Sequence, residues 1–203
     1  MFDSANYRHC EESTPKACNA KQAVIAVTGP MAAGKNYICR KLEKEEGWAS
    51  VDADLLVHDA IELVKERILE TFIPYAQEQN LKLKKEDGSI DRRALGQLLF
   101  SFPELLKVQE SMVYPIITKW INDFIEEHEK TIINATVLYK TPELLKRCEK
   151  IIFVTAPFMI RLKRARHRDK LSYRQIFRRF RAQKNLLQEY QKSGIPIEII
   201  NNI

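Results

Sequence analysis

An apolar stretch that runs directly into a glycine-flanked loop constrains this chain more than any other feature. Residues 23–29 read AVIAVTG, a continuous apolar run typical of a strand that is buried on both faces of a parallel sheet. The run ends in the pattern Gly29-x-x-x-x-Gly34-Lys35, and residues 34–46 have the composition of a helix. In this order, backbone N–H groups and the positive end of a helix dipole enclose phosphate oxygens, and Lys35 reaches the β and γ phosphates. The alternative interpretation is an ordinary glycine turn between a strand and a helix.

The residue after the lysine departs from the usual pattern. Phosphate-binding loops normally continue with Ser or Thr, whose hydroxyl binds Mg²⁺, and here the position holds Asn36. The asparagine side chain still offers a carbonyl oxygen, but one atom further from the backbone. We therefore expect a retained phosphate cradle and a weakened or water-bridged metal contact at Asn36.

Beyond the loop, short β-rich runs alternate with helical patterns. Residues 55–72 keep apolar side chains at helical spacing, and Pro103 suits the first turn of a following helix. Because strands that alternate with helices form a largely parallel sheet covered on both faces, the predicted fold class is α/β. Residues 55–130 are too many for one crossover, and we interpret them as a helical insertion. The other predicted strands span residues 48–54, 131–138, 150–157 and 195–202.

Length and composition fit one globular domain. The chain has 203 residues, of which 45% are hydrophobic and 30% charged, a balance without bias toward disorder. No apolar run approaches the roughly 18 residues of a membrane span, and the N-terminus lacks the apolar stretch of a secretory signal. The four cysteines show neither a C-x-x-C pair nor metal-ligand spacing, so we expect free thiols and a cytoplasmic protein. Residues 1–20 are predicted to form a mobile tail, and residues 21–203 the domain.

Two acidic residues lie at the end of the second predicted strand. Residues 51–54 read VDAD, and His58 lies one helical turn beyond Asp54. Ligands of open α/β sheets bind beyond the carboxyl ends of the strands, where the first strand also delivers its loop. Asp52 and Asp54 point the same way if the chain stays extended, and a carboxylate there can accept a proton from a substrate hydroxyl or hold Mg²⁺ through water. The alternative is that Asp54 merely caps the helix, and the local sequence leaves both interpretations open.

One segment carries the positive charge of the chain. The net charge is +6, yet residues 161–184 hold eleven Lys or Arg and one acidic residue, so the rest of the chain is negative. Arg161, Arg164 and Arg168 fall on one helix face, and phosphoryl transfer needs such charges over the transferred group. An anionic partner is favoured over a solvated helix face. Aromatic residues that would stack on nucleic-acid bases are present, but their spacing predicts a buried helix face, which argues against nucleic acid. These aromatic residues are Tyr173, Phe177 and Phe180.

Five pieces of sequence, in chain order, carry a family resemblance. They are VTGPMAAGKN, VDADLLVHD, DGSIDRRALGQLLFSFPELLKVQESMVYPII, RLKRARHRDKLS with Gln183 downstream, and IEIINN. Over residues 23–202 the chain thereby resembles the dephospho-CoA kinases. The third piece is the most specific, because other kinases with a phosphate loop and an arginine lid rarely share it.

The resemblance implies a P-loop kinase fold with three α/β/α layers, a five-stranded parallel sheet, a helical CoA-binding insertion over residues 55–130 and an arginine-rich lid over residues 158–190. The implied reaction is ATP-dependent, Mg²⁺-assisted phosphorylation of the 3′-hydroxyl of dephospho-CoA, the last step of coenzyme A synthesis. Asp54 matches the aspartate that serves as base in the family. The implied catalytic residues are Asp54, Lys35, Arg164 and Arg168. The implied acceptor-binding residues are Asp52, Asp54, His58 and Tyr114. The implied nucleotide-binding residues are Thr28, Gly29, Ala32, Ala33, Gly34, Lys35, Asn36, Tyr37 and Asn202.

The chain departs from the family pattern at three places. Asn36 replaces the metal-binding hydroxyl, and Tyr114 stands where the family typically has histidine. The third strand of the family usually ends D-x-P-L-L-F-E, whereas residues 134–140 read NATVLYK, so that Lys140 reverses a charge near the expected substrate site. Two alternatives stay open: another P-loop kinase of small molecules or nucleotides, and a non-catalytic relative that binds an anion or nucleic acid. We expect a small-molecule substrate and no membrane association.

Overall fold

The structure is a computed structural model, and it describes residues 22–169 and 172–203. The predicted tail at residues 1–20 lies outside the described residues. In the described part, Cys39 and Cys148 are buried free thiols, as predicted. No helix within these ranges is both long and apolar enough to cross a membrane.

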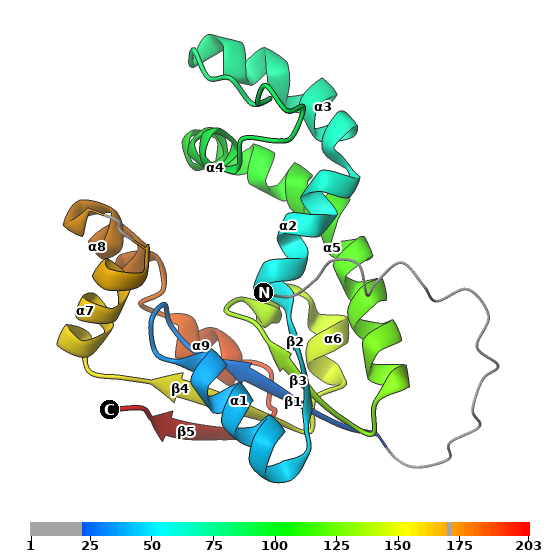
Figure 1. Cartoon of the computed structure of the whole chain (residues 1–203), viewed down its shortest axis with the longest axis vertical. Coiled ribbons are helices and arrows are strands. Elements are labelled where there is room, and N and C mark those ends of the chain that lie inside the picture. The colour runs from blue at the N-terminus through cyan, green and yellow to red at the C-terminus, as the bar shows by residue number, and fades with distance from the viewer. Residues whose placement is uncertain (1–21, 170–171) are drawn as a thin grey trace.

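Five strands form one sheet in which all neighbouring strands are parallel, as predicted (Figure 1). The strand order is β2-β3-β1-β4-β5, so the first strand lies at the centre of the sheet. Three predicted strands are too long at their carboxyl ends by two residues or more: those expected at 48–54, 131–138 and 150–157 end at Asp52, Asn134 and Thr155. The polar residues that follow the first two of these strands therefore lie outside the sheet, at the edge where the phosphate loop begins. The strands are β1 (Ala23–Thr28), β2 (Ala49–Asp52), β3 (Lys130–Asn134), β4 (Lys150–Thr155) and β5 (Ile197–Asn201).

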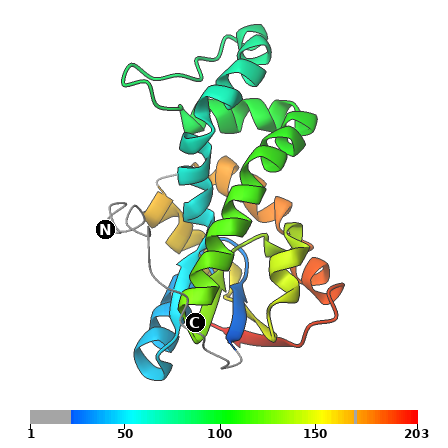
Figure 2. The ribbon, with the colours of Figure 1, turned by 90° about the vertical axis from the view of Figure 1, so that its right-hand side faces the viewer.

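Helices cover both faces of the sheet, because successive side chains of each strand point to opposite sides. Ile25 and Val27 of β1 pack against α1 (Lys35–Glu46), whereas Val24 and Ala26 belong to a larger core on the other face. Figure 2 shows α1 on one side of the strands and α6 on the other, which confirms the predicted three layers. The helices on the side of the larger core are α5 (Pro103–Glu127), α6 (Pro142–Lys146) and α9 (Leu186–Gln191).

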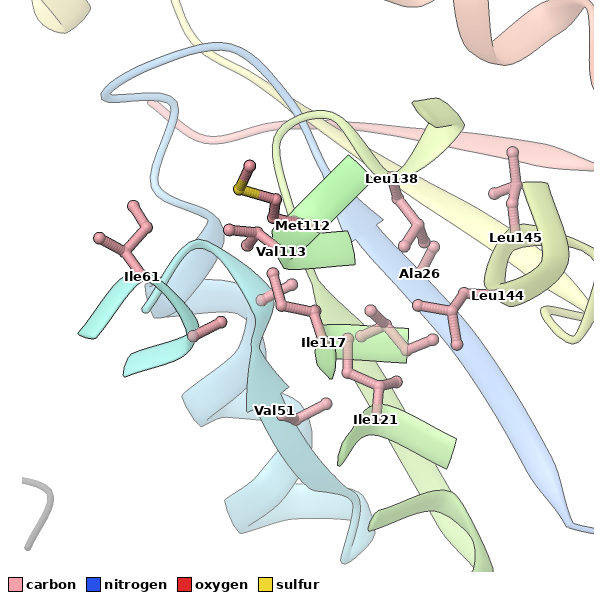
Figure 3. Close-up of a cluster of buried hydrophobic side chains, with 14 of the residues drawn as sticks. Ala26, Val51, Ile61, Met112, Val113, Ile117, Ile121, Leu138, Leu144 and Leu145 are labelled. Atoms are coloured by element: carbon pink, nitrogen blue, oxygen red, sulfur yellow. The ribbon is translucent and has the colours of Figure 1, made fainter. Parts of the chain in front are cut away.

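Helices between β2 and β3 rise away from the sheet (Figures 1 and 2). The helix predicted over residues 55–72 is divided, because Val64 leaves the helical conformation with φ −102° and ψ 19°. Figure 3 shows that Ile61, Met112 and Ile117 from these helices share one apolar cluster with Val51 of the sheet. The insertion and the sheet therefore have a continuous core. The helices that precede α5 are α2 (Ala53–Leu63), α3 (Lys65–Glu78) and α4 (Arg92–Ser101).

Two basic helices follow β4 and form the arginine-rich lid. The buried aromatic face predicted for the second of them is wrong at two of its three residues, since Tyr173 is 55% exposed and Phe177 is 46% exposed. Phe180 is partly buried and packs against the apolar cluster of Met31 and Ile176. Arginine side chains cover some of the rings instead: the guanidinium of Arg161 lies 4.2 Å from the ring centroid of Phe180, and that of Arg166 lies 5.3 Å from Tyr173. The spacing of the aromatic residues thus gives no argument against nucleic acid as the anionic partner. The geometry of the site distinguishes nucleic acid from a small ligand that carries phosphate groups. The lid helices are α7 (Phe158–Asp169) and α8 (Tyr173–Ala182).

Candidate active site

The phosphate loop, residues 29–34, has a backbone that requires glycine at both ends. Gly29 has φ 144° and Gly34 has φ 99°. A Cβ atom on Gly29 would lie 2.1 Å from the carbonyl oxygen of Val154, and one on Gly34 would lie 1.9 Å from Nδ2 of Asn202. Ala32 is also left-handed, with φ 61°, a strained conformation of the kind that gathers at functional sites. A tightly curled loop that leads into a helix N-terminus is the geometry of a phosphate cradle.

The lid holds the apex of the phosphate loop. The N–H of Met31 donates to Oε1 of Gln183 at 2.7 Å, and the carbonyl oxygen of Met31 accepts from Nε of Arg161 at 3.0 Å. Burial lowers the pKa of the Arg161 guanidinium. Met31 also packs in a small apolar cluster with Ile176 of α8. Loop and lid are thereby joined through both polar and apolar contacts.

Lys35 begins α1 and is half-buried beneath the loop. Its Nζ donates to the carbonyl oxygen of Gly29 at 3.1 Å. Burial lowers the pKa of Lys35, and the negative charges of Asp54 and Asp52 oppose that shift. The charge of Arg168 acts in the same direction as burial. The predicted lysine, both aspartates and a lid arginine therefore influence one another at this edge of the sheet.

The two aspartates have different roles in the local structure. Asp52 caps α2, because its Oδ1 accepts a hydrogen bond from the N–H of Leu55 at 3.2 Å. The alternative in which Asp54 caps the helix is therefore wrong, and so is the extended chain, since Ala53 already begins α2. Burial, together with the charge of Asp54, raises the pKa of Asp52. Asp54 is exposed, and its Oδ2 accepts from the hydroxyl of Thr136 at 2.8 Å.

Asn36 faces the end of the third strand. Its Oδ1 accepts from Nδ2 of Asn134 at 3.0 Å, and the same amide donates to Oδ2 of Asp52 at 3.2 Å. Asn134 is only 4% exposed, and its own Oδ1 is buried without a hydrogen-bond partner in the described part of the chain. The oxygen of Asn36 that we expected to meet a metal is thus bound to an amide, and three oxygen-bearing side chains converge below the loop.

Arg164 and Asn202 contact the phosphate loop from the side of β4 and β5. Nη1 of Arg164 donates to the carbonyl oxygens of Ala33 at 3.4 Å and Asn202 at 3.3 Å. Nδ2 of Asn202 donates to the carbonyl oxygen of Ala33 at 2.9 Å. The structure therefore brings these predicted residues together with the loop.

Other predicted residues lie at the margins of the site. Thr28 is fully buried, and its hydroxyl donates to the carbonyl oxygen of Thr136 at 3.4 Å, so it supports the site from below. Tyr37 is 63% exposed in the first turn of α1. His58 is exposed on α2, where partial desolvation and the charge of Arg92 lower its pKa. These positions frame the site without contributing to the hydrogen bonds around Lys35.

Two departures from the family pattern meet at one carboxylate. The hydroxyl of Tyr114 donates to Oε1 of Glu110 at 3.1 Å, and Nζ of Lys140 donates to the same oxygen at 2.5 Å. Burial and the charge of Glu110 raise the pKa of Tyr114. The negative charge of Glu110 therefore compensates the positive charge that Lys140 introduces.

An apolar pocket lies beside Asp54. It is lined by Ala53, Val57, Tyr114, Ile117, Val137 and Leu138.

Sequence reasoning did not place Glu110, Asn134 or Thr136 in the site. A signal existed for the last two, because Asn134 ends and Thr136 follows a strand whose carboxyl end adjoins that of β1. No local signal existed for Glu110, since its partner Lys140 lies far away in the sequence and meets it only through packing of α5.

The arrangement suits phosphoryl transfer to an alcohol. An amide-lined loop, an ammonium group and arginine side chains lie on one side, and an exposed carboxylate beside an apolar pocket lies on the other. Such transfer needs little covalent chemistry from the protein and depends on positioning and electrostatic stabilisation.

Known proteins with similar sequences and folds identify the family of the chain. A family model described as dephospho-CoA kinase matches residues 23–202. A dephospho-CoA kinase of Treponema denticola is 36% identical over 173 residues, which cover 82% of this chain and 76% of that protein. Among solved structures, TT1252 from Thermus thermophilus has a TM-score of 0.70 at 25% identity, covering 90% of this chain and 89% of that one. Dephospho-CoA kinase from Campylobacter jejuni has a TM-score of 0.55 at 26% identity, covering 91% and 90% of the two chains. The chain therefore belongs to the dephospho-CoA kinase family.

Proposed function

We propose that the protein transfers the γ-phosphoryl group of ATP to the 3′-hydroxyl of dephospho-CoA, which yields ADP and coenzyme A. The observation that carries this proposal is the convergence of Lys35 and Asp54 at the edge of the sheet where the phosphate loop begins. The hydroxyl oxygen attacks the γ-phosphorus, the bond from that phosphorus to the β–γ bridging oxygen breaks, and the hydroxyl proton passes to Asp54.

The residues around the loop take roles that follow from their contacts. The loop and Lys35 bind the phosphates of ATP, in place of the hydrogen bond that Lys35 now makes to Gly29. Arg164, which lies against the loop, and Arg168, whose charge acts on Lys35, stabilise the charge on the transferred group. Asn202 supports the nucleotide side of the loop through Ala33.

The polar cluster below the loop fits Mg²⁺. The buried Oδ1 of Asn134 has no hydrogen-bond partner among the described residues, and the carboxylate of Asp52 adds further oxygen atoms, whereas Oδ1 of Asn36 already accepts from Asn134. Mg²⁺ prefers oxygen ligands and is usually held by few protein groups together with water and substrate phosphates. No group of three His, Cys, Asp or Glu side chains within residues 22–169 and 172–203 forms a metal site, in keeping with such an open arrangement. When bound, Mg²⁺ neutralises charge on the β and γ phosphates.

The acceptor side is formed by the helical insertion. Tyr114 of α5 and Val57 of α2 line the apolar pocket beside Asp54. The charge of Arg92 on α4 acts on His58 of α2, so the insertion offers a cationic group as well as apolar side chains, which suits an acceptor that carries a diphosphate. Helices α2 to α5 therefore bind dephospho-CoA in this proposal.

The test is an acceptor panel with purified protein, ATP and Mg²⁺. ADP release and the mass of the product are measured with dephospho-CoA, with nucleosides and nucleotides, and with no acceptor, and Lys35→Ala serves as the control for contaminating kinases. The proposal predicts ADP and coenzyme A in equal amounts with dephospho-CoA, and only background with the other acceptors. Faster turnover of another acceptor identifies a different small-molecule kinase, and no turnover of any acceptor identifies a non-catalytic relative.

A further inference from the structure

Thr136 contacts both oxygen atoms of the Asp54 carboxylate. Its hydroxyl donates to Oδ2 at 2.8 Å, and its backbone N–H lies 3.4 Å from Oδ1 in a second, longer hydrogen bond. The first of these is a short hydrogen bond to a charged acceptor, which is the stronger class of such bonds. Both oxygen atoms of the proposed base are thereby bound by a single residue from another element.

Thr136 is itself fixed from below. Its carbonyl oxygen accepts from the hydroxyl of Tyr190 at 3.2 Å and from the hydroxyl of Thr28 at 3.4 Å. The Tyr190 hydroxyl also accepts from the N–H of Leu138 at 2.8 Å, so Tyr190 bridges two points of the loop after β3. Tyr190 is fully buried, and its ring packs edge-on against that of Tyr139, with 5.6 Å between centroids. The backbone of Thr136, whose hydroxyl donates to Asp54, is therefore held in place by buried side chains.

Asp54 needs such a contact because its own position restrains it little. It is exposed in the first turn of α2, where a carboxylate samples several rotamers. Its charge also acts on Lys35, and a carboxylate that turned toward this lysine would form an ion pair instead of meeting a substrate hydroxyl.

We propose that Thr136 is a positioning residue that holds the Asp54 carboxylate in one orientation, ready to accept the acceptor proton and kept from pairing with Lys35. This inference rests on the proposed function.

Three variants separate positioning from packing. Thr136→Val removes the hydroxyl and keeps shape and N–H, and Thr136→Ser restores a hydroxyl. Thr131→Val is the matched control, because this buried threonine lies at the other end of β3 and its hydroxyl has no hydrogen-bond partner in the described residues. We expect Thr136→Val to lower kcat by roughly tenfold to a hundredfold. We expect the KM for ATP and the melting temperature to stay near wild type, and Thr136→Ser and Thr131→Val to keep most of the activity.

The double variant with Asp54→Asn tests whether Thr136 acts through Asp54. In that background, Thr136→Val is expected to have no further effect on kcat, because the group that it positions is already gone. Wild-type kcat in Thr136→Val would overturn the inference, and so would an equal fractional loss in both backgrounds.

A second readout is independent of turnover. Three-bond NMR couplings of Asp54 in the substrate-free protein report its χ1 angle, which is expected to be single in wild type and Thr136→Ser and averaged in Thr136→Val. Averaged couplings in wild type would contradict the positioning role even in an active enzyme. A single rotamer in a wild type that fails to phosphorylate dephospho-CoA would refute the proposed function but not the contact.

Discussion

The side chains of Asn36 and Asn134 form a hydrogen bond below the phosphate loop. Both positions differ from the family pattern, so the two departures are in direct contact. The oxygen of Asn36 accepts from the amide of Asn134, which also reaches Asp52. A threonine at position 36 would be too short to make the same contact, but it would present its hydroxyl one atom closer to the helix, where a metal is bound in other phosphate loops. The two asparagines thus keep polar contacts at this position, but the Asn36 oxygen is bound to Asn134 and is not available to a metal ion.

Asn36→Thr is expected to keep the activity and to lower the Mg²⁺ concentration that gives the half-maximal rate. The reason is that a hydroxyl replaces an amide oxygen that is occupied by Asn134. A Mg²⁺ titration at fixed ATP measures the effect. Loss of activity at an unchanged melting temperature would instead show that the amide has a dedicated role.

Lys35→Ala is expected to reduce kcat by about a hundredfold to a thousandfold, because it removes a preorganised positive charge from the transferred phosphoryl group. The fold should persist, since alanine is favourable in the first turn of a helix. Lys41→Ala is the control, because Lys41 lies on the same helix, is exposed, and forms an ion pair only with Glu45 among the residues that the structure describes. Steady-state kinetics measures kcat, and circular dichroism checks that the variant is folded. A fully active Lys35→Ala enzyme would contradict the proposed role of this residue.

At the scale of elements, the strands and helices whose position depends on a local pattern of residues can be predicted from the sequence. The apolar run of β1, the glycine loop and the helical spacing that follows suffice to predict the centre of the sheet and the phosphate loop. The end of β2 differs from the prediction because Asp52 accepts a hydrogen bond from the N–H of Leu55 and α2 begins at Ala53. The strand β3 is also shorter than predicted and ends at Asn134. The exposure of Tyr173 and Phe177 on α8 was not predicted, because helical spacing identifies which residues share a helix face but not what covers that face. The contact of Glu110 with Lys140 was unpredictable, since it depends on where α5 crosses the end of β3.

Lys140→Glu is expected to loosen the junction between α5 and the turn Leu138–Lys140, because it places a second carboxylate against Glu110. The ion pair is partly exposed, so the loss of stability should be about 1 kcal/mol. A rise in the KM for the acceptor should accompany it, since Tyr114 shares the Glu110 carboxylate. Thermal unfolding and steady-state kinetics measure the two effects.

The charge swap Glu110→Lys with Lys140→Glu is the matched control. It restores an ion pair across the same junction and is expected to recover most of the stability. A swap that is as unstable as the single variant would show that the sign of the charges is not what matters at this junction.

At the scale of the whole molecule, one core joins the helical insertion to the sheet. Phe72 of α3 and Ile133 of β3 are both fully buried members of this core. Composition and the alternation of strands and helices predicted a single α/β domain, but not that the insertion would share its core, because periodicity shows which face of a helix is apolar and not what it packs against.

Phe72→Ala is therefore expected to destabilise the whole described domain in one cooperative transition. Removing a fully buried phenylalanine costs about 3–5 kcal/mol. Helical circular dichroism and the fluorescence of Trp48, followed with Trp120 on α5 replaced by phenylalanine, should shift together on thermal unfolding. Separate transitions for the two signals would show that the insertion unfolds on its own.

The central claim is that the phosphate loop holds ATP while Asp54 readies the acceptor hydroxyl, and a single-turnover comparison of wild type with Asp54→Asn tests it most directly. ATP affinity is measured by calorimetry, and transfer to dephospho-CoA is followed by rapid quench. We predict that the variant binds ATP as wild type does and transfers the phosphoryl group at least about a hundredfold more slowly. Transfer at the wild-type rate by Asp54→Asn, or failure of the wild type to bind ATP, would contradict the account.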